Sequence, residues 1–245
     1  MRVLILAAGY GTRLYPLTLD LPKTFLLIDE EPLLNHIIKK VDGLKKTVNL
    51  DEIIIVTNNK FYRRFLDWKE EFKREDIKIL NDGSNDPGDK RGVVGDIKFA
   101  IGNNRDNWLI LGSDNFFNWG LEEFVSFSLE RAPSPVVGIY DIKNKESASQ
   151  FGVVKINKDS LIEEFIEKPE SPKSSLVATC LYFFPGESLN FIDKYIGSYE
   201  NVDMAGQYIS WLISKTKTYS FLFKGIWLDI GSREALEEAT TGLRI

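Results

Sequence analysis

Two basic and two acidic residues, far apart in the sequence, are of types that handle phosphate groups and a metal ion. Arg13 offers a planar fork of N–H donors and Lys23 a compact positive charge, a pair suited to a polyphosphate. Asp114 follows the apolar run 108–111, where its carboxylate could bind Mg²⁺ or cap the next turn. Asp229 has apolar neighbours, and a buried carboxylate needs a partner or a metal. These residues are therefore candidates for phosphate chemistry.

The basic residues belong to a loop that directly follows the first apolar run, Val3 to Leu6. Gly9 and Gly11 can adopt backbone dihedrals that a Cβ forbids, so the loop can direct several N–H groups toward one anion. A Walker loop would need Gly-Lys-Ser/Thr and a dinucleotide-binding loop a third glycine, but Thr12-Arg13-Leu14 follows here. Both of these common phosphate loops are therefore excluded.

The composition excludes several classes of protein. With 245 residues, 43% hydrophobic and 27% charged, the chain is expected to be a soluble globular protein with about one α/β domain. The formal net charge of −5 offers no basic surface for nucleic acid, and no apolar run approaches the ~20 residues of a membrane span. The apolar residues after Arg2 read as a strand rather than a signal peptide. We therefore expect a cytoplasmic protein without nucleic-acid or membrane partners.

The chain has one cysteine, Cys180, and one histidine, His36. An internal disulfide and a Cys/His metal site are thus excluded, and a bound metal would be Mg²⁺ or Mn²⁺ on oxygen ligands. His36 falls off the apolar stripe of its predicted helix, which predicts a surface residue without a catalytic role. Cys180 is predicted to pack as a small hydrophobic residue rather than to act as a nucleophile.

The order of apolar runs predicts a βαβαβ arrangement followed by closely spaced strands. Helices are expected at residues 32–46, 61–74, 93–101, 121–131, 187–195, 205–214 and about 232–239. Strands are expected at residues 3–6, 53–56, 77–80, 108–111, 136–140, 152–156, 160–165, 176–183 and 219–223. The first part predicts a parallel sheet that binds ligands beyond the carboxyl ends of its strands, and the second an antiparallel addition. The sheet is therefore expected to be mixed.

Several short motifs occur in a fixed order along the chain. They are Ala-Gly-x-Gly-Thr-Arg-Leu-x-Pro-Leu-Thr from Ala8, Pro22-Lys23, Gly112-Ser113-Asp114-Asn115, Phe151-Gly152-Val153-Val154, Glu167-Lys168-Pro169, Ala178-Thr179-Cys180-Leu181-Tyr182 and Trp227-Leu228-Asp229-Ile230-Gly231-Ser232. Over nearly the whole chain they resemble the motifs of the sugar-1-phosphate nucleotidyltransferases, also called NDP-sugar pyrophosphorylases. The pattern is most similar to the glucose-1-phosphate thymidylyltransferases and uridylyltransferases.

The resemblance implies a set of site residues. It implies nucleotide binding by Ala8, Gly9, Gly11, Thr12, Arg13, Asn81 and Gly92, and sugar-phosphate binding by Gly152, Glu167, Lys168, Ala178 and Thr179. It also implies Mg²⁺ on Asp114 and Asp229, and catalytic roles for Arg13, Lys23 and Lys168. The loop 81–95 would close over the nucleobase. Residues 1–120 would mainly bind the nucleotide and residues 121–245 the sugar phosphate.

The implied fold is a single-domain α/β/α sandwich with a Rossmann-like mixed sheet. The implied reaction joins a nucleoside triphosphate to a sugar 1-phosphate and releases pyrophosphate. A phosphate oxygen is the attacking group, so no side-chain nucleophile or base is needed. The carboxy-terminal β-helix of many relatives is absent up to Ile245, which argues against an acetyltransferase function.

Departures from the family pattern leave the substrates open. Asn81 stands where a glutamine is common, and Cys180 stands where the family has glycine. We expect dTTP or UTP with a hexose 1-phosphate, while CTP with phosphocholine is an alternative that the aromatic residues Tyr182, Phe183 and Trp227 could favour. A glycosyltransferase would show an Asp-x-Asp motif near the central strands, and Gly112-Ser113-Asp114-Asn115 is not one, which argues against that class. A non-catalytic sugar-nucleotide sensor is a further alternative, and a homo-oligomer is open.

Overall fold

Three parallel strands form the frame of the first of two compact units: β1 (Arg2–Ala7), β4 (Glu52–Thr57) and β5 (Ile77–Asn81). The computed structural model describes residues 1–199 and 203–241. The first unit comprises residues 1–91, 111–121 and 225–245, and the second comprises residues 92–110 and 122–224. Each unit therefore combines segments that are distant in the sequence.

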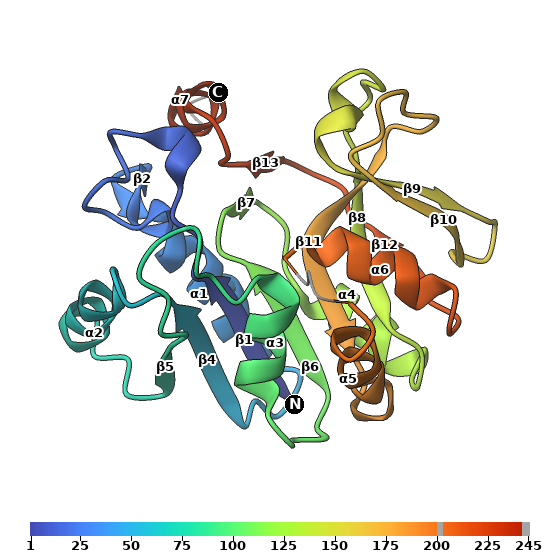
Figure 1. Cartoon of the computed structure of the whole chain (residues 1–245), viewed down its shortest axis with the longest axis horizontal. Coiled ribbons are helices and arrows are strands. Elements are labelled where there is room, and N and C mark those ends of the chain that lie inside the picture. Colours follow the sequence, from blue (N-terminus) through green and yellow to red (C-terminus); the bar gives the residue numbers. More distant parts are fainter. Residues whose placement is uncertain (200–202, 242–245) are drawn as a thin grey trace. The chain divides into compact units, whose positions relative to one another are not determined.

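The register of the parallel strands aligns their carboxyl ends. Ala7 is paired with Thr57, and Thr57 with Asn81, so three loops leave the same edge of the sheet (Figure 1). β1 and β4 are apolar on both faces, as expected for buried parallel strands, with Val3, Leu4 and Ile5 all fully buried, whereas β5 exposes Lys78 on one face. The predicted binding edge is therefore formed by the loops after β1, β4 and β5.

Helices and short strands complete the first unit. The helices are α1 (Leu33–Leu44), α2 (Tyr62–Glu71) and α7 (Arg233–Thr241), with short 3₁₀ turns η1 (Thr12–Leu14) and η2 (Lys23–Phe25). The short strands are β2 (Leu27–Ile28), β3 (Glu31–Pro32), β7 (Asn115–Phe117) and β13 (Trp227–Asp229). The strand β6 (Trp108–Gly112) runs through the boundary between the units. None of the four short strands carries a clear apolar alternation, and the sequence did not predict them.

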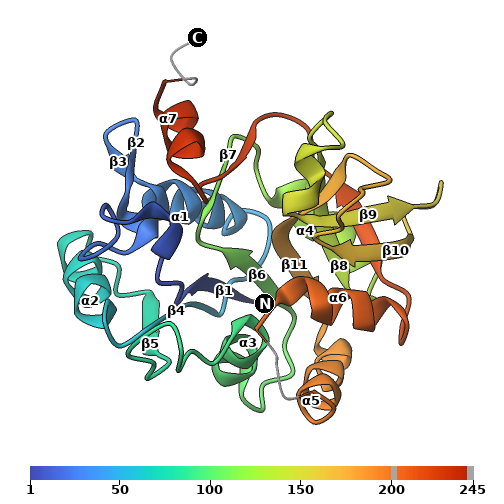
Figure 2. The same cartoon turned by 45° about the horizontal axis from the view of Figure 1, so that its top comes forward.

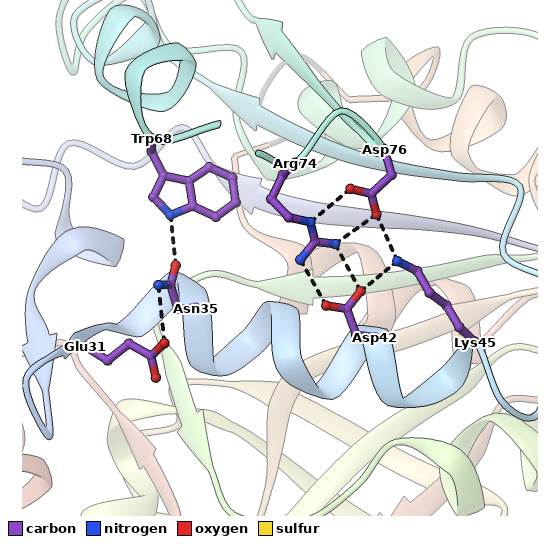
Figure 3. Close-up of polar contacts among 7 residues, drawn as sticks. All are labelled: Glu31, Asn35, Asp42, Lys45, Trp68, Arg74 and Asp76. Carbon is purple, nitrogen blue, oxygen red and sulfur yellow. Dashed lines mark hydrogen bonds and ion pairs between the residues drawn. The ribbon is translucent and has the colours of Figure 1, made fainter. Parts of the chain in front are cut away.

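An ion-pair network holds the end of α1 against the turn before β5 (Figure 3). The Arg74 guanidinium donates to both carboxylate oxygens of Asp42, at 2.9 and 3.0 Å, and also to Asp76. Lys45 pairs with both aspartates. A second chain of polar contacts in the same figure runs from Trp68 to Asn35 and on to Glu31. These contacts fix α1 and α2 of the first unit.

The second unit contains a mixed sheet. Its strands are β8 (Val136–Asp141), β9 (Gly152–Ile156), β10 (Ile162–Glu167), β11 (Leu176–Phe184) and β12 (Tyr219–Leu222). The pairs β8–β11 and β9–β10 are antiparallel, whereas β12 is parallel to β8. The helices are α3 (Val93–Ile101), α4 (Glu122–Glu130), α5 (Asn190–Ile196) and α6 (Ala205–Ile213). The prediction of a mixed α/β fold is therefore confirmed.

Helix α6 packs on the β9–β10 hairpin (Figure 2). Ser210 on α6 donates to the carbonyl oxygen of Phe165 on β10 at 3.1 Å. The expected helix at 187–195 is divided between a 3₁₀ turn, η4 (Gly186–Ser188), and α5, and a further turn, η3 (Ser147–Gln150), precedes β9. Within residues 1–199 and 203–241, every helix is too short or too polar to cross a bilayer.

Two single-residue predictions need correction. His36 is half-buried rather than on the surface: its Nε2 lies 2.9 Å from the carbonyl oxygen of Ile28, and its ring meets Phe116 edge-on. Cys180 is exposed and does not pack in the core. Its φ of 55° lies in the left-handed region, where the register of β11 against β8 shifts. A left-handed conformation at a strand irregularity is one that glycine adopts most easily, which gives a physical reason why the resembled family has glycine where this chain has Cys180.

Candidate functional site

Among the residues that the structure describes, the backbone N–H groups of the glycine loop have no hydrogen-bond acceptor. Gly11 has a φ of 64° and leads directly into η1. In the described part of the chain, no backbone N–H of residues 9–12 donates a hydrogen bond. The loop is held from outside instead, because Thr18 donates to the carbonyl oxygen of Gly11 at 2.7 Å and Asn58 to that of Ala8 at 2.9 Å. A fixed loop with several open N–H donors has the chemistry that anion binding requires.

A long-range strand pair brings the two candidate metal ligands together. β7 and β13 are antiparallel, with Asp229 opposite Asn115, and the N–H of Ile230 donates to the carbonyl oxygen of Asp114 at 2.8 Å. Trp227 on β13 also donates through its indole N–H to the Asn115 side chain at 2.8 Å. Pairing of β7 with β13 therefore places both aspartates at one end of the same two-stranded ribbon.

Both aspartates lie beside cations. The Lys23 ammonium is 2.7 Å from Oδ2 of Asp114, and these side chains are 16% and 34% exposed. A Cβ on Gly231 would lie 3.3 Å from the Arg13 guanidinium and 3.2 Å from a carboxylate oxygen of Asp229, so both groups adjoin this glycine. Burial raises the pKa of Asp114, but Lys23 and Arg13 outweigh it, so its pKa lies below the ordinary value. Asp114 is therefore an anion at neutral pH.

The carboxylates suit a hard cation that keeps open coordination positions. Among the described residues there is no group of three or more His, Cys, Asp or Glu side chains that could hold a metal. A cation here would thus take two carboxylates from the protein and its remaining oxygen ligands from substrate and water, which is how Mg²⁺ binds with nucleotides. Oδ2 of Asp114 is paired with Lys23 and Oδ1 accepts from Asn115 at 3.0 Å. A metal would therefore compete with Lys23 for Asp114.

The candidate base-binding residues lie where the loop after β5 begins and ends. The Asn81 carboxamide accepts from the N–H of Gly83 at 2.9 Å and donates to Asn59 at 2.8 Å. Among the described residues, these contacts use the amide oxygen and one of the two amide N–H groups of Asn81, and the second N–H stays open. Gly92, at the start of α3 in the second unit, has a φ of 78°.

The second unit places the candidate sugar residues Gly152 and Glu167 together. A Cβ on Gly152 would lie 2.4 Å from the Phe165 ring and 3.1 Å from the Glu167 carboxylate. A Cβ on Gly206 would lie only 1.8 Å from that carboxylate. Burial raises the pKa of Glu167, and the charge of Lys168 partly offsets the shift. Gly206 is thus a residue that sequence reasoning missed, because nothing in its local pattern indicates that a carboxylate from β10 lies against α6.

The other candidate sugar residues differ in accessibility. Lys168 is exposed, with a φ of 45°, and its backbone N–H donates to the carbonyl oxygen of Phe151 at 3.0 Å. Ala178 and Thr179 are buried in β11, and the Thr179 hydroxyl donates to the carbonyl oxygen of Gly138 at 3.0 Å. The Lys168 ammonium is therefore available to a phosphate, whereas the Thr179 hydroxyl already serves the sheet.

A mixed α/β fold with an open glycine loop beside paired aspartates and cations is the architecture of a protein that handles nucleotides. The chain belongs to the nucleotidyl transferase family, whose model matches residues 2–244. The family comprises sugar-1-phosphate nucleotidyltransferases, so the family membership predicted from the motifs is confirmed.

Curated relatives cover most of this chain. It is 31% identical to the bifunctional protein GlmU of Methanocaldococcus jannaschii over 94% of its length, and 28% identical to the mannose-1-phosphate guanylyltransferase catalytic subunit beta of Xenopus tropicalis, also over 94%. It spans only 51% and 61% of the lengths of these two relatives. It is 28% identical to a glucose-1-phosphate thymidylyltransferase of Neisseria meningitidis, covering 98% of this chain and 82% of the relative.

A solved structure shares the fold. UDP-glucose pyrophosphorylase complexed with UDP-glucose superimposes with a TM-score of 0.82 at 20% identity, covering 99% of this chain and 98% of that chain. At this identity the similarity supports the fold alone. The relatives are named for different nucleotides and sugars, so their names do not select one substrate pair.

Proposed function

We propose that the chain joins a nucleoside triphosphate to a sugar 1-phosphate and releases pyrophosphate with the help of Mg²⁺. The observation that carries the proposal is the set of side chains next to the open glycine loop: Lys23 on Asp114, with Arg13 and Asp229 around Gly231. Two cations and two carboxylates here can neutralise a triphosphate and hold its metal. The names of the relatives support the same class of reaction.

Each residue of the first unit has a distinct task in this proposal. The N–H groups of residues 9–12 and the Arg13 guanidinium hold the phosphates that leave as pyrophosphate. Lys23 exchanges Asp114 for the α-phosphate when substrate binds. Asp114 and Asp229 would hold Mg²⁺, which when bound supplies charge neutralisation on the α-phosphate and orientation of both reactants. Asn81 contributes to the nucleobase side.

In the second unit, Lys168 attracts the phosphate of the sugar 1-phosphate and Glu167 accepts from sugar hydroxyls. Gly152 leaves room for the Phe165 ring beside Glu167 and so helps to place that carboxylate, and Ala178 and Thr179 shape the neighbouring strand β11. A phosphate oxygen attacks the α-phosphorus in line, the bond to pyrophosphate breaks, and pyrophosphate carries away the negative charge. Since the attacking group is already charged, catalysis is by positioning and charge neutralisation.

We propose that the substrates are a pyrimidine nucleotide, dTTP or UTP, and a hexose 1-phosphate. Phosphocholine with CTP and nucleotide sensing without catalysis are the alternatives. We further propose a cytoplasmic location, and self-association stays a prediction.

The test is a pyrophosphate-release assay with Mg²⁺ that crosses dTTP, UTP, CTP, ATP and GTP with hexose 1-phosphates and phosphocholine. Release that requires one nucleotide and one phosphate together would establish the reaction and its substrates. The Lys23→Met protein serves as the negative control. Silence across the panel, together with nucleotide-induced thermal stabilisation, would contradict catalysis and favour the sensor.

A further inference from the structure

The side chain of Tyr10 leaves the glycine loop and enters the core. Tyr10 stands between Gly9 and Gly11, yet the residue is only 6% exposed, and its ring packs against Phe61 with ring centroids 6.5 Å apart. The backbone of this residue belongs to the proposed phosphate site, whereas its phenol points elsewhere. Because the ring is packed in the core, a shift of the Tyr10 backbone either moves the phenol as well or is prevented by the packing of the ring.

The phenol ends in a buried hydrogen-bond chain. Tyr10 Oη donates to the Ser84 hydroxyl at 3.1 Å, and that hydroxyl lies 2.8 and 2.9 Å from the two carboxylate oxygens of Asp82. Ser84 and Asp82 are 3% and 2% exposed. Hydrogen bonds that end on a carboxylate away from water are strong and sensitive to geometry. Burial raises the pKa of the Tyr10 phenol, partly offset by the bond to Ser84, so the phenol remains a proton donor.

Ser84 lies in the loop after β5, which has no helix or strand of its own. Within residues 85–89 the hydrogen bonds are mostly local, and Asp89 accepts from the N–H of Asn85 at 2.9 Å. The loop is also bonded to the segment after β4, because the N–H of Asn59 donates to the carbonyl oxygen of Ser84 at 2.9 Å and the Asn59 side chain donates to that of Asn85 at 2.8 Å. The local bonds define the shape of the loop, and the two Asn59 bonds fix it against the segment after β4. The Tyr10 phenol therefore links the position of this loop directly to that of the glycine loop.

We propose that Tyr10 is a positioning residue that couples the two loops, so that a polyphosphate bound at residues 9–12 also orders residues 82–89. The coupling rests on the proposed function, since it assigns the phosphates to the first loop and the nucleobase to the second. An anion attracts the open N–H groups around Tyr10, and the phenol carries this constraint to Ser84 and Asp82. The nucleobase then binds to residues 82–89 when this loop is already ordered, so less conformational entropy is lost on binding.

Hydrogen–deuterium exchange with pyrophosphate as the probe tests the coupling. Pyrophosphate has no base, so any protection of residues 82–89 must come through the protein. The variants are Tyr10→Phe, Ser84→Ala and their combination. Tyr62→Phe is the matched control, because it removes a phenol from α2 of the same unit that makes no hydrogen bond or ring contact with either loop among residues 1–199 and 203–241.

The expected result is that pyrophosphate slows exchange at residues 9–14 and 82–89 in the wild type and in Tyr62→Phe. In Tyr10→Phe, protection of 9–14 persists while that of 82–89 falls about three- to tenfold, the range for one lost hydrogen bond. KM for the nucleotide rises by a similar factor with kcat within about twofold. The double variant is no worse than either single variant, because all three break one chain.

Other results overturn the proposal. Undiminished protection of 82–89 in Tyr10→Phe would show that the phenol does not transmit the constraint. Protection of 9–14 without any effect on 82–89 in the wild type would refute the coupling and leave the proposed function standing. If pyrophosphate protects neither segment, the phosphate site itself is wrong and both proposals fail.

Discussion

Replacing Asp114 with asparagine should separate catalysis from stability. Asparagine keeps the shape of the side chain and one oxygen that can accept from Lys23, but it loses the charge that would bind Mg²⁺. Asp114 is 34% exposed and lies on a short ribbon rather than in the core. Its main contribution is therefore expected to be electrostatic.

The two effects differ in size. Removing one preorganised charged group from a transition state typically costs about 3–4 kcal/mol, or roughly 100- to 1,000-fold in kcat. Removing one charge from the part-exposed pair with Lys23, 2.7 Å apart, should cost only about 1 kcal/mol of folding free energy, because desolvation offsets most of the attraction. For a chain of this length that is a fall in Tm of about 2–4 °C.

Asp42→Asn is the matched control. It also removes one carboxylate from a part-exposed ion pair, since Asp42 is 38% exposed and accepts twice from Arg74 (Figure 3). We expect it to lower Tm by a similar amount or more and to leave kcat unchanged. Pyrophosphate release per folded molecule and a thermal melt on both variants make the comparison.

Equal kcat in Asp114→Asn and wild type would refute the metal assignment. A fall in kcat of the same size in both variants would refute it too, because the loss would then follow stability rather than the site. Binding of Mn²⁺ in the presence of nucleotide gives an independent readout, and it should weaken only in Asp114→Asn.

Further predictions concern the second unit and the ion-pair network. Gly206→Ala should raise KM for the sugar phosphate more than KM for the nucleotide, because the new Cβ would lie 1.8 Å from the Glu167 carboxylate and must displace it; equal KM values would contradict this. Because burial raises the pKa of Glu167, ionisation destabilises the fold above the unfolded pKa, so Glu167→Gln should raise Tm at pH 8 and leave it unchanged near pH 4; melts at both values decide. Hydrogen bonding to Arg74 lowers the pKa of Asp76, so the Asp76 carboxylate stabilises the fold at pH 7 and does so less as the pH falls below about 4. Asp76→Asn should therefore lower Tm at pH 7 and lower it less in acid; a loss of Tm that does not depend on pH would contradict the assignment.

Local patterns predicted most of the elements. The strands β1, β4 and β5 lie within one residue of the predicted ranges. Continuous apolar runs, typical of buried parallel strands, mark β1 and β4, and β5 has a shorter run with one polar residue. The glycine loop was predictable for the same reason, since Gly9 and Gly11 follow such a run directly. Where a signal was local, the sequence was sufficient.

Contacts between distant residues were not predictable in this way. The motif reading named Asp114 and Asp229, but only the pairing of β7 with β13 brings them to one place, and neither short strand has a pattern of its own. The contact of Lys23 with Asp114 joins positions 91 residues apart, so no spacing rule could find it. Tyr10 looked like the variable residue of a glycine motif until its phenol was found on Ser84.

The sequence by itself determined the side chains available to this protein: an α/β chain with a glycine loop, cations and carboxylates in a fixed order, and a single histidine and a single cysteine. Residue type sets what a side chain can bind, and apolar periodicity sets which segments become strands and helices. Tertiary structure alone decided which of these groups meet, which are already paired and which backbone donors stay open. Those outcomes depend on long-range strand pairing and burial, which arise only when the whole chain packs.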